Sequence, residues 1–160
     1  MGTQVEIVPA DPTDDDVRPL LDEHVAEMYA TSPIESVHAL DATALSHASI
    51  TFFVARDDGG VIGTGALREL SAAEGELKSM RTAERARGRG VGARMLEHLI
   101  SVARARGYRA LRLETGVEEH FAPARRLYER YGFVEGEPFA DYRPDPNSVF
   151  MHLEFEADES

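Results

Sequence analysis

Cysteine and tryptophan are absent from this 160-residue chain, and Lys78 is its only lysine. Without cysteine the chain has no disulfide framework, no thiolate metal site and no cysteine nucleophile. Long hydrophobic runs are missing as well. No stretch of about 18 apolar residues exists that could cross a membrane, and the first ten residues lack the basic start and apolar centre of a signal peptide. We therefore expect a cytoplasmic protein, and the length fits a single domain over residues 1–160.

Positive charge is scarce too. Asp and Glu number 29 against 17 Lys and Arg, which gives a formal net charge of −12. A field of that sign repels nucleic acid and anionic membranes, so we expect neither as a partner. The acidic, lysine-poor composition resembles that of proteins from salt-loving (halophilic) organisms, in which high salt screens the repulsion. An ordinary acidic soluble protein remains the alternative.

Apolar periodicity predicts one α/β domain. Alternating runs predict strands at 5–8, 50–56, 61–70, 76–82, 108–114, 133–134 and 149–155. Helical spacing predicts helices at 14–29, 33–48 (broken), 91–106 and 124–131. Thr13, followed by three aspartates, is the expected N-cap of the first helix. In the strand at 76–82, Leu77 and Met80 are both expected to face the core.

The segment 84–96 carries the most informative local pattern. Gly88, Gly90 and Gly92 alternate with other residues among several arginines, and an amphipathic helix pattern starts at once. Glycine lets backbone N–H groups approach a ligand without a Cβ in the way. The first turn of a helix leaves N–H groups unpaired and carries partial positive charge. A glycine-rich loop that runs into a helix is therefore an anion site, usually for phosphate.

A family resemblance begins at the same place. The R/Q-x-x-G-x-G/A acetyl-CoA signature of the GNAT superfamily of N-acetyltransferases is matched by Arg87-Gly88-Arg89-Gly90-Val91-Gly92. The strand at 77–82 and the later segment Ala124-x-x-Leu127-Tyr128-Glu129-x-x-Gly132-Phe133 stand in family order and spacing. The chain thus resembles this superfamily over about residues 50–155, and its end segment resembles a small, mostly uncharacterised prokaryotic branch.

This resemblance implies a fold. The GNAT fold, of class α/β (α+β), has a mixed, mostly antiparallel, V-split sheet of six to seven strands flanked by about four helices. Acetyl-CoA lies in the split, as the acetyl donor.

The resemblance also implies the contacts of acetyl-CoA. Backbone N–H groups of residues 88–92 would hold the pyrophosphate, and the side chains of Arg87 and Arg89 would contact or steer the phosphates. The backbone around Met80 and Thr82 would pair with the pantetheine arm and polarise the acetyl carbonyl. Thr82 stands where the family often has valine, which is tolerable because the backbone makes the contact.

Direct acetylation of an amine needs a proton acceptor for the ammonium, N–H donors for the oxyanion and a proton for the departing thiolate. Tyr128 matches the tyrosine that is the general acid in many relatives; a core tyrosine is the alternative. Glu114 occupies the strand position that is a catalytic glutamate in some relatives, and Glu76 stands at the other position that the family resemblance allows for a general base. A solvated charge at the strand end is the alternative for Glu76, and a water relay with no single base is the third arrangement.

The six histidines are scattered without metal-ligand spacing, so we expect no metal. His38 and His47 lie in the segment that covers the acceptor site in relatives, although surface histidines are expected there. Tyr29 and Tyr142 are candidates to line the acceptor site.

The sequence therefore predicts an N-acetyltransferase that moves acetyl from acetyl-CoA to a primary amine, of a small molecule rather than a protein, with a homodimer left open. A non-catalytic acyl-CoA-binding module is the alternative. The fingerprint Gly88-x-Gly90-x-x-Ala93 also fits dinucleotide binding. That fingerprint should directly follow its strand in a βαβ unit, whereas about five residues separate it from Thr82. A toxin that acetylates charged tRNA is disfavoured by the net charge.

Overall fold

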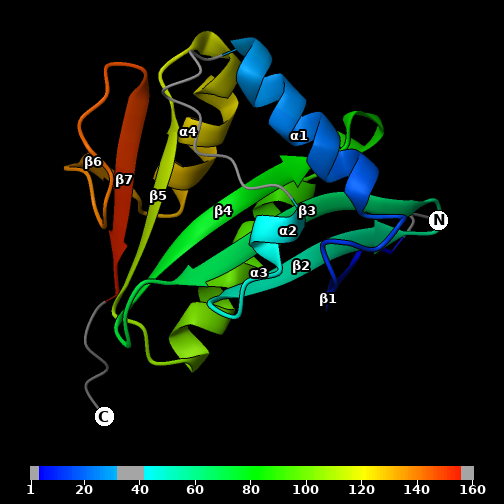
Figure 1. The fold of residues 1–160 in the computed structure, drawn as a ribbon, viewed down its shortest axis with the longest axis horizontal. Coiled ribbons are helices and arrows are strands. Elements are labelled where there is room, and N and C mark those ends of the chain that lie inside the picture. The colour runs from blue at the N-terminus through cyan, green and yellow to red at the C-terminus, as the bar shows by residue number, and fades with distance from the viewer. Residues whose placement is uncertain (1–3, 32–41, 156–160) are drawn as a thin grey trace.

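A seven-stranded sheet forms the centre of the molecule in the computed structural model, which describes residues 4–31 and 42–155 (Figure 1). The strand order is β1-β2-β3-β4-β5-β7-β6. The strands are β1 (Glu6–Pro9), β2 (Ile50–Asp57), β3 (Gly60–Glu69), β4 (Glu74–Thr82), β5 (Ala110–Gly116), β6 (Val134–Gly136) and β7 (Ser148–Glu154). Among the described strands, only β4 and β5 pair in parallel; the other neighbours are antiparallel. The predicted mixed, mostly antiparallel sheet is confirmed.

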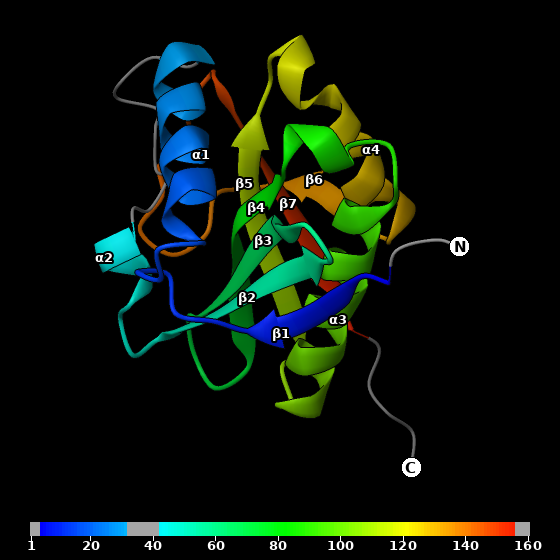
Figure 2. The same cartoon turned by 90° about the vertical axis from the view of Figure 1, so that its right-hand side faces the viewer.

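Four α-helices in the described part of the chain cover the two faces of this sheet. They are α1 (Arg18–Thr31), α2 (Ala42–Leu45), α3 (Val91–Ala105) and α4 (Ala122–Arg130), with short 3-10 turns η2 (Glu84–Ala86) and η3 (Glu119–Phe121). Figure 2 shows α1 and α2 on one face and α3 and α4 on the other. Each face has its own core. Met95, Leu99 and Leu111 belong to the core under α3 and α4, and Leu21 and Phe52 to the core under α1 and α2.

The sheet splits between β4 and β5. Their parallel ladder covers only three pairs, which begin at Glu74 with Ala110 and end at Glu76 with Arg112. From there the two strands diverge, with α1 and α4 on either side of the opening (Figure 1). Along the described residues, β4 therefore has no ladder partner on its β5 side beyond Glu76, and its backbone polar groups there can pair with a ligand.

A β-bulge in β4 lies beside this split. Thr64 of β3 pairs with Arg81 but Ala66 pairs with Lys78, so β4 carries one extra residue between the two pairs. Ser79, within the bulge, has a φ of 53°, and its carbonyl accepts a hydrogen bond from Thr64 Oγ1 at 2.6 Å.

The bulge explains why two residues three apart share one face. In a regular strand, residues three apart point to opposite faces. The extra residue shifts the alternation, so Leu77 and Met80 both pack against the core under α3 and α4, as expected from the sequence.

The predicted start of the first helix is wrong. Asp11 accepts hydrogen bonds from the Thr13 N–H at 2.8 Å and its Oγ1 at 2.7 Å, so Thr13 closes a turn and caps no helix. The chain turns again around Asp14, and α1 begins only at Arg18. Buried Val17 anchors this entry to the core.

Other predicted boundaries also differ from the structure. β4 begins at Glu74, two residues earlier than expected, because the Leu70 and Ser71 N–H groups both bond to the Glu74 carbonyl and tighten the preceding turn. Of the helix predicted at 33–48, residues 33–41 lie outside the described residues, and α2 forms only at Ala42–Leu45.

Candidate active site

Two adjoining cavities lie in the split. The smaller one, of about 120 Å³, lies between the diverging halves of β4 and β5, and we name it the split cavity. The larger one, of about 390 Å³, continues between the end of β4, the first turn of α3 and α4, and we name it the loop cavity. The residues that line both cavities are His24, Met28, Met80, Phe121, Ala124 and Tyr128. The site thus extends from the glycine loop past Tyr128 into the split.

The glycine loop turns into α3 through left-handed backbone. Gly88 and Gly90 have φ angles of 80° and 77°, and Gly90 directly precedes the first turn of α3. Open space surrounds the position that a Cβ would take on either glycine. Val91 and Gly92, at the start of the helix, line the loop cavity. The N–H groups of this turn have no acceptor within the helix, so they can bind an anion.

The predicted acetyl-CoA contacts divide into two groups. Five of them line the loop cavity: Met80, Thr82, Arg87, Val91 and Gly92. Gly88, Arg89 and Gly90 lie in the loop beside it and are not part of its wall. The Arg89 guanidinium points instead to Asp57, with Nη1 at 3.4 Å from Oδ2.

Asp57 holds the arginines of this loop to the β2–β3 hairpin. Arg85 donates two hydrogen bonds to the Asp57 carboxylate, both at 3.0 Å, and the Gly59 N–H donates a third at 2.8 Å. Arg85, above all, lowers the pKa of Asp57 to about 2. A Cβ on Gly59 would stand 3.1 Å from Arg85 Nη2, so the hairpin glycine leaves room for this pair.

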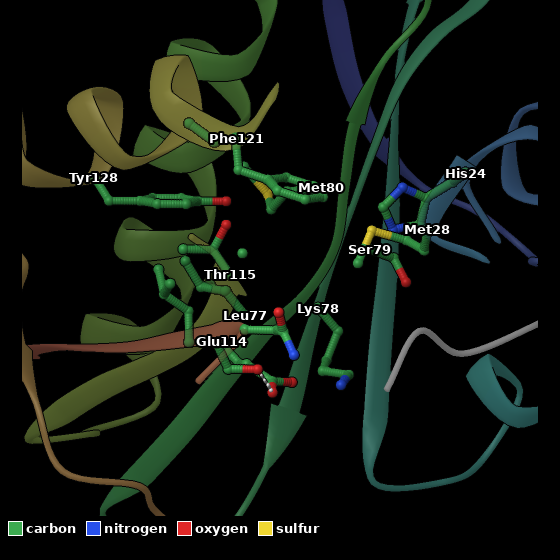
Figure 3. A pocket seen from close by; sticks show the side chains of 15 residues that line it. His24, Met28, Leu77, Lys78, Ser79, Met80, Glu114, Thr115, Phe121 and Tyr128 are labelled. Atoms are coloured by element: carbon green, nitrogen blue, oxygen red, sulfur yellow. Dashed lines mark hydrogen bonds between the residues drawn. The ribbon is translucent and has the colours of Figure 1, made fainter. Parts of the chain in front are cut away.

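Tyr128 belongs to the core and also reaches the cavity. The side chain is buried, and its ring packs edge-on against Phe133 at 5.8 Å between centroids. Its hydroxyl nevertheless points into the cavity (Figure 3). Burial raises the pKa of Tyr128 to about 12, because the phenolate would lose its hydration. The phenol is therefore protonated at neutral pH, as a general acid must be.

Glu114 lines the split cavity from β5. Its Oε2 accepts a hydrogen bond from Ser148 Oγ at 2.8 Å, which fixes the carboxylate at the polar end of the cavity (Figure 3). The position allows Glu114 to accept a proton from an amine in that space.

Glu76 lies beneath the split cavity and is not part of its wall. The expected solvated alternative is wrong, since the side chain has no exposed surface. Its Oε2 accepts a hydrogen bond from the Tyr142 hydroxyl at 2.6 Å and lies 3.5 Å from Lys78 Nζ, while Oε1 lies 3.6 Å from Arg68 Nη1. The sequence does not reveal this burial, because Tyr142, which covers Glu76, lies 66 residues further along the chain.

His24 is a site residue that the sequence analysis missed. It lies on the α1 surface that faces both cavities, and burial together with the nearby Arg81 cation lowers the pKa of His24 to about 4. The imidazole is thus neutral at neutral pH and able to accept hydrogen bonds. Its spacing from Leu20 and Met28, four residues on either side, could have indicated the inward-facing side of the helix.

Charged pairs connect α1 to the far wall of the loop cavity. Arg81 of β4 forms ion pairs with Glu23 and Glu27, and Glu27 also contacts the His120 ring from η3. Glu27, Arg81 and His120 all line the loop cavity. These ion pairs link α1 to β4 and to η3 around the loop cavity.

The remaining acceptor-site candidates are placed differently. Tyr142 contacts Glu76 and Lys78, while Tyr29 is about half exposed (53%) and does not line either cavity. His47 is exposed and bonded to Ser49, and His38 lies outside the described residues.

Neither a metal cluster nor a membrane span was found in the described ranges. No group of three or more potential ligand side chains within residues 4–31 and 42–155 is arranged to hold a metal ion. No described helix is long and apolar enough to cross a bilayer.

Comparison with known proteins identifies the relatives of this chain. The Acetyltransferase (GNAT) family matches residues 17–133. The N-acetyltransferase YsnE of Bacillus subtilis is 49% identical over 82% of this chain and 87% of its own, and the IAA acetyltransferase of Azospirillum brasilense is 42% identical over 82% and 83%.

Solved structures show the same fold. The acyl-CoA N-acyltransferase structure from Klebsiella pneumoniae superposes with a TM-score of 0.77 at 29% identity, over 95% of this chain and 98% of that one. A GNAT acetyltransferase structure from Elizabethkingia anophelis, with acetyl-CoA bound to it, superposes with a TM-score of 0.66 at 20% identity, over 94% and 98%.

Proposed function

The chain belongs to the acetyltransferase (GNAT) family, and we propose that this enzyme transfers an acetyl group from acetyl-CoA to a primary amine of a small molecule. One observation carries the proposal. Two adjoining cavities with shared lining residues extend from the start of α3, whose N–H groups can bind an anion, to Tyr128 and the Glu114 carboxylate. From the start of α3 to the split, the lining residues suit in turn the phosphates, the narrow polar pantetheine arm and the thioester of acetyl-CoA.

The chain fits acetyl-CoA at each of these parts. The first turn of α3 and Arg87 offer N–H groups and positive charge to the pyrophosphate. Beyond Glu76, where its ladder with β5 ends, β4 offers backbone groups to the amides of the pantetheine arm. The backbone N–H near Met80, beside the bulge, is the donor proposed for the acetyl carbonyl.

The reaction then needs two proton transfers. A neutral amine attacks the thioester carbon, so the N–C bond forms and the C–S bond breaks. Glu114, or water held by it, takes the proton that the ammonium loses, and the Tyr128 phenol gives a proton to the departing thiolate. Glu76 does not line the cavity and would act only through Tyr142, so Glu114 is the better candidate for the base.

A small acceptor fits the split cavity better than a protein segment does. The space beside Glu114 is about 120 Å³, which suits an amine and a few further heavy atoms. The net charge of −12 also works against nucleic-acid acceptors. Family membership favours the enzyme over the non-catalytic acyl-CoA-binding module.

Thiol release from acetyl-CoA in the presence of a panel of primary amines tests the proposal. We expect release only when an amine is present, and an N-acetylated product in equal amount. Glu114→Gln should lower kcat at neutral pH by about 10²-fold, the common scale for loss of a general base. Glu119→Gln, a change to an exposed glutamate on η3, is the matched control and should leave kcat unchanged. Thiol release that ignores the amine would contradict acetyl transfer to it.

A further inference from the structure

The two cavities meet where the thioester of acetyl-CoA would lie in the function proposed above. Among the described residues that line both cavities, only Tyr128 and His24 carry a side-chain nitrogen or oxygen. Tyr128 comes from α4 and His24 from α1, and Figure 3 shows the two side chains on opposite sides of Met80. The proposed reaction centre therefore has one polar side chain from each side of the split.

These two side chains have complementary hydrogen-bonding capacities. The buried Tyr128 phenol is protonated and can donate. Burial, and then the nearby Arg81 cation, lower the pKa of His24 to about 4, so the ring is neutral at neutral pH and one of its nitrogens can accept a hydrogen bond. The departing thiolate needs a proton and gains nothing from an acceptor. The attacking amine, in contrast, brings N–H groups that an acceptor can bind.

A neutral primary amine brings two N–H groups into the split cavity. One proton must leave once the N–C bond has formed, and Glu114 on β5 is the proposed base for it. The other proton stays on nitrogen and becomes the N–H of the product amide. His24 and Glu114 both line the split cavity, whose volume of about 120 Å³ keeps an amine nitrogen inside it close to both walls.

We propose that His24 accepts a hydrogen bond from the amine N–H that the product retains, and that this contact makes the enzyme selective for primary over secondary amines. The inference rests on the function proposed above and assigns a specificity-determining residue to the same site. His24 gains no proton in any step. The amine loses its proton to Glu114, the Tyr128 phenol protonates the thiolate, and the imidazole stays neutral throughout.

The selectivity follows from the number of N–H groups. A secondary amine has only one, which it must lose to Glu114, so it would leave the acceptor nitrogen of His24 unpaired and press an alkyl group against it. A site that is built to bind an N–H rejects analogues without it, because its buried polar group is then left without a partner. Contacts from both walls also aim the lone pair of a primary amine at the acetyl carbon.

Paired amines test the inference. Each primary amine is compared with its N-methyl derivative at saturating acetyl-CoA, and wild type should favour the primary member by at least about 10-fold in kcat/KM. In His24→Leu, which fills much of the same space without an acceptor, this preference should fall by at least about 5-fold. His24→Gln keeps an acceptor and should retain most of the preference. His47→Leu, a change to an exposed histidine that lines neither cavity, should leave it unchanged.

The outcomes separate this inference from the proposed function. A preference of equal size in wild type and His24→Leu, including rejection of every N-methyl amine by both, would assign it to size alone and overturn the role of His24. Equal turnover of both members by wild type would overturn it as well. Thiol release that ignores the amine would instead contradict the proposed function itself. Urea unfolding and acetyl-CoA calorimetry check that His24→Leu is folded, and His24→Ala, which suits a helix and also lacks an acceptor, is the second variant for the same comparison.

Discussion

Tyr128 belongs to the core, and we propose that the same side chain is the general acid of the reaction. Its ring contributes to the core under α3 and α4, and the same burial keeps the hydroxyl protonated where it enters the cavity. A phenol with a pKa of about 12 is a weak acid towards water. A thiolate that leaves within hydrogen-bond reach is nevertheless a sufficient base while the C–S bond breaks.

We predict that Tyr128→Phe lowers kcat about 10²-fold while the protein stays folded, since only the hydroxyl is lost. Tyr131→Phe is the control, because the Tyr131 hydroxyl bonds to Glu97 and does not line either cavity. Because the pKa of Tyr128 is raised, the phenol stays protonated well above pH 10. Its ionisation should therefore cause no loss of activity at any pH up to about 10. Steady-state kinetics across pH measures both effects. An unchanged kcat in Tyr128→Phe would remove this hydroxyl from the mechanism.

The lowered pKa of His24 leads to a prediction about stability in acid. Its pKa is about 4 in the folded protein and about 6.5 in the unfolded chain, so between these values the unfolded state binds the proton and the folded state does not. The free energy of unfolding should therefore fall as the pH drops from about 6.5 towards 4. Urea titrations should show a shallower fall over this window in His24→Gln. His47→Gln, a change to an exposed histidine, should behave as wild type. Identical slopes for wild type and His24→Gln would mean that His24 is already charged in the fold.

At the scale of elements, the start of α3 is the proposed donor site. Gly90 precedes the helix with a φ of 77°, where a side chain would project into open space beside the predicted pyrophosphate. Asp and Asn have the same shape and both tolerate the left-handed conformation better than most residues do. Their comparison therefore separates charge from backbone strain.

We predict that Gly90→Asp abolishes acetyl-CoA binding, whereas Gly90→Asn retains it with an affinity at least about 10-fold higher than any residual binding by Gly90→Asp. The difference arises from repulsion between the carboxylate and the phosphates. Isothermal calorimetry on the two variants measures it. Equal affinities would place the pyrophosphate elsewhere.

The close approach of α3 to β3 positions this helix. A Cβ on Gly65 would stand 2.7 Å from Met95 Cγ and 3.0 Å from Leu99 Cδ1, so in Gly65→Ala these two side chains, or the helix that carries them, must shift. We predict a loss of about 1–3 kcal/mol in the free energy of unfolding, the usual range for overpacking. Gly92→Ala, whose Cβ would meet its nearest atom at 3.5 Å, should cost nothing in stability. Denaturant unfolding of both variants checks this, and equal stability of Gly65→Ala and wild type would contradict the described packing.

Local patterns in the sequence predicted most of these elements. The glycine loop, α3 and the hairpin strands follow from short-range periodicity and turn chemistry, which depend on neighbours in the chain. The entry to α1 was mispredicted because Asp11 competes for Thr13 through a local turn. The bulge at Ser79 leaves only one trace in the sequence, the spacing of Leu77 and Met80.

Long-range contacts in the site were beyond prediction. Glu76 and Tyr142 meet because the loop before β7 folds back over β4, and no local pattern records that pairing. The enclosure of His24 by β4 and Arg81 likewise depends on how α1 crosses the sheet. Most of the predicted donor contacts lie in one loop and the helix that follows it, where local patterns can indicate them, whereas the acceptor-site candidates come from several segments that only the fold brings together.

At the scale of the whole molecule, charge is distributed unevenly. A chain of formal charge −12 repels an anionic donor at long range, so binding depends on local positive groups. Arg87, which lines the loop cavity, and the start of α3 are the groups that we propose for this, whereas Arg85 and Arg89 pair with Asp57. Salt weakens both the repulsion and the attraction, and the short-range attraction to the phosphates should be the larger of the two when the donor is bound.

Calorimetric titration of the protein with acetyl-CoA, beside NADH and at low and high salt, tests the central claim most directly. We predict micromolar binding of acetyl-CoA with a stoichiometry of one donor per chain, weaker at high salt, and no binding of NADH. Binding of NADH with equal strength, or of neither compound by folded protein, would contradict the assignment of the glycine loop and its cavity to acetyl-CoA.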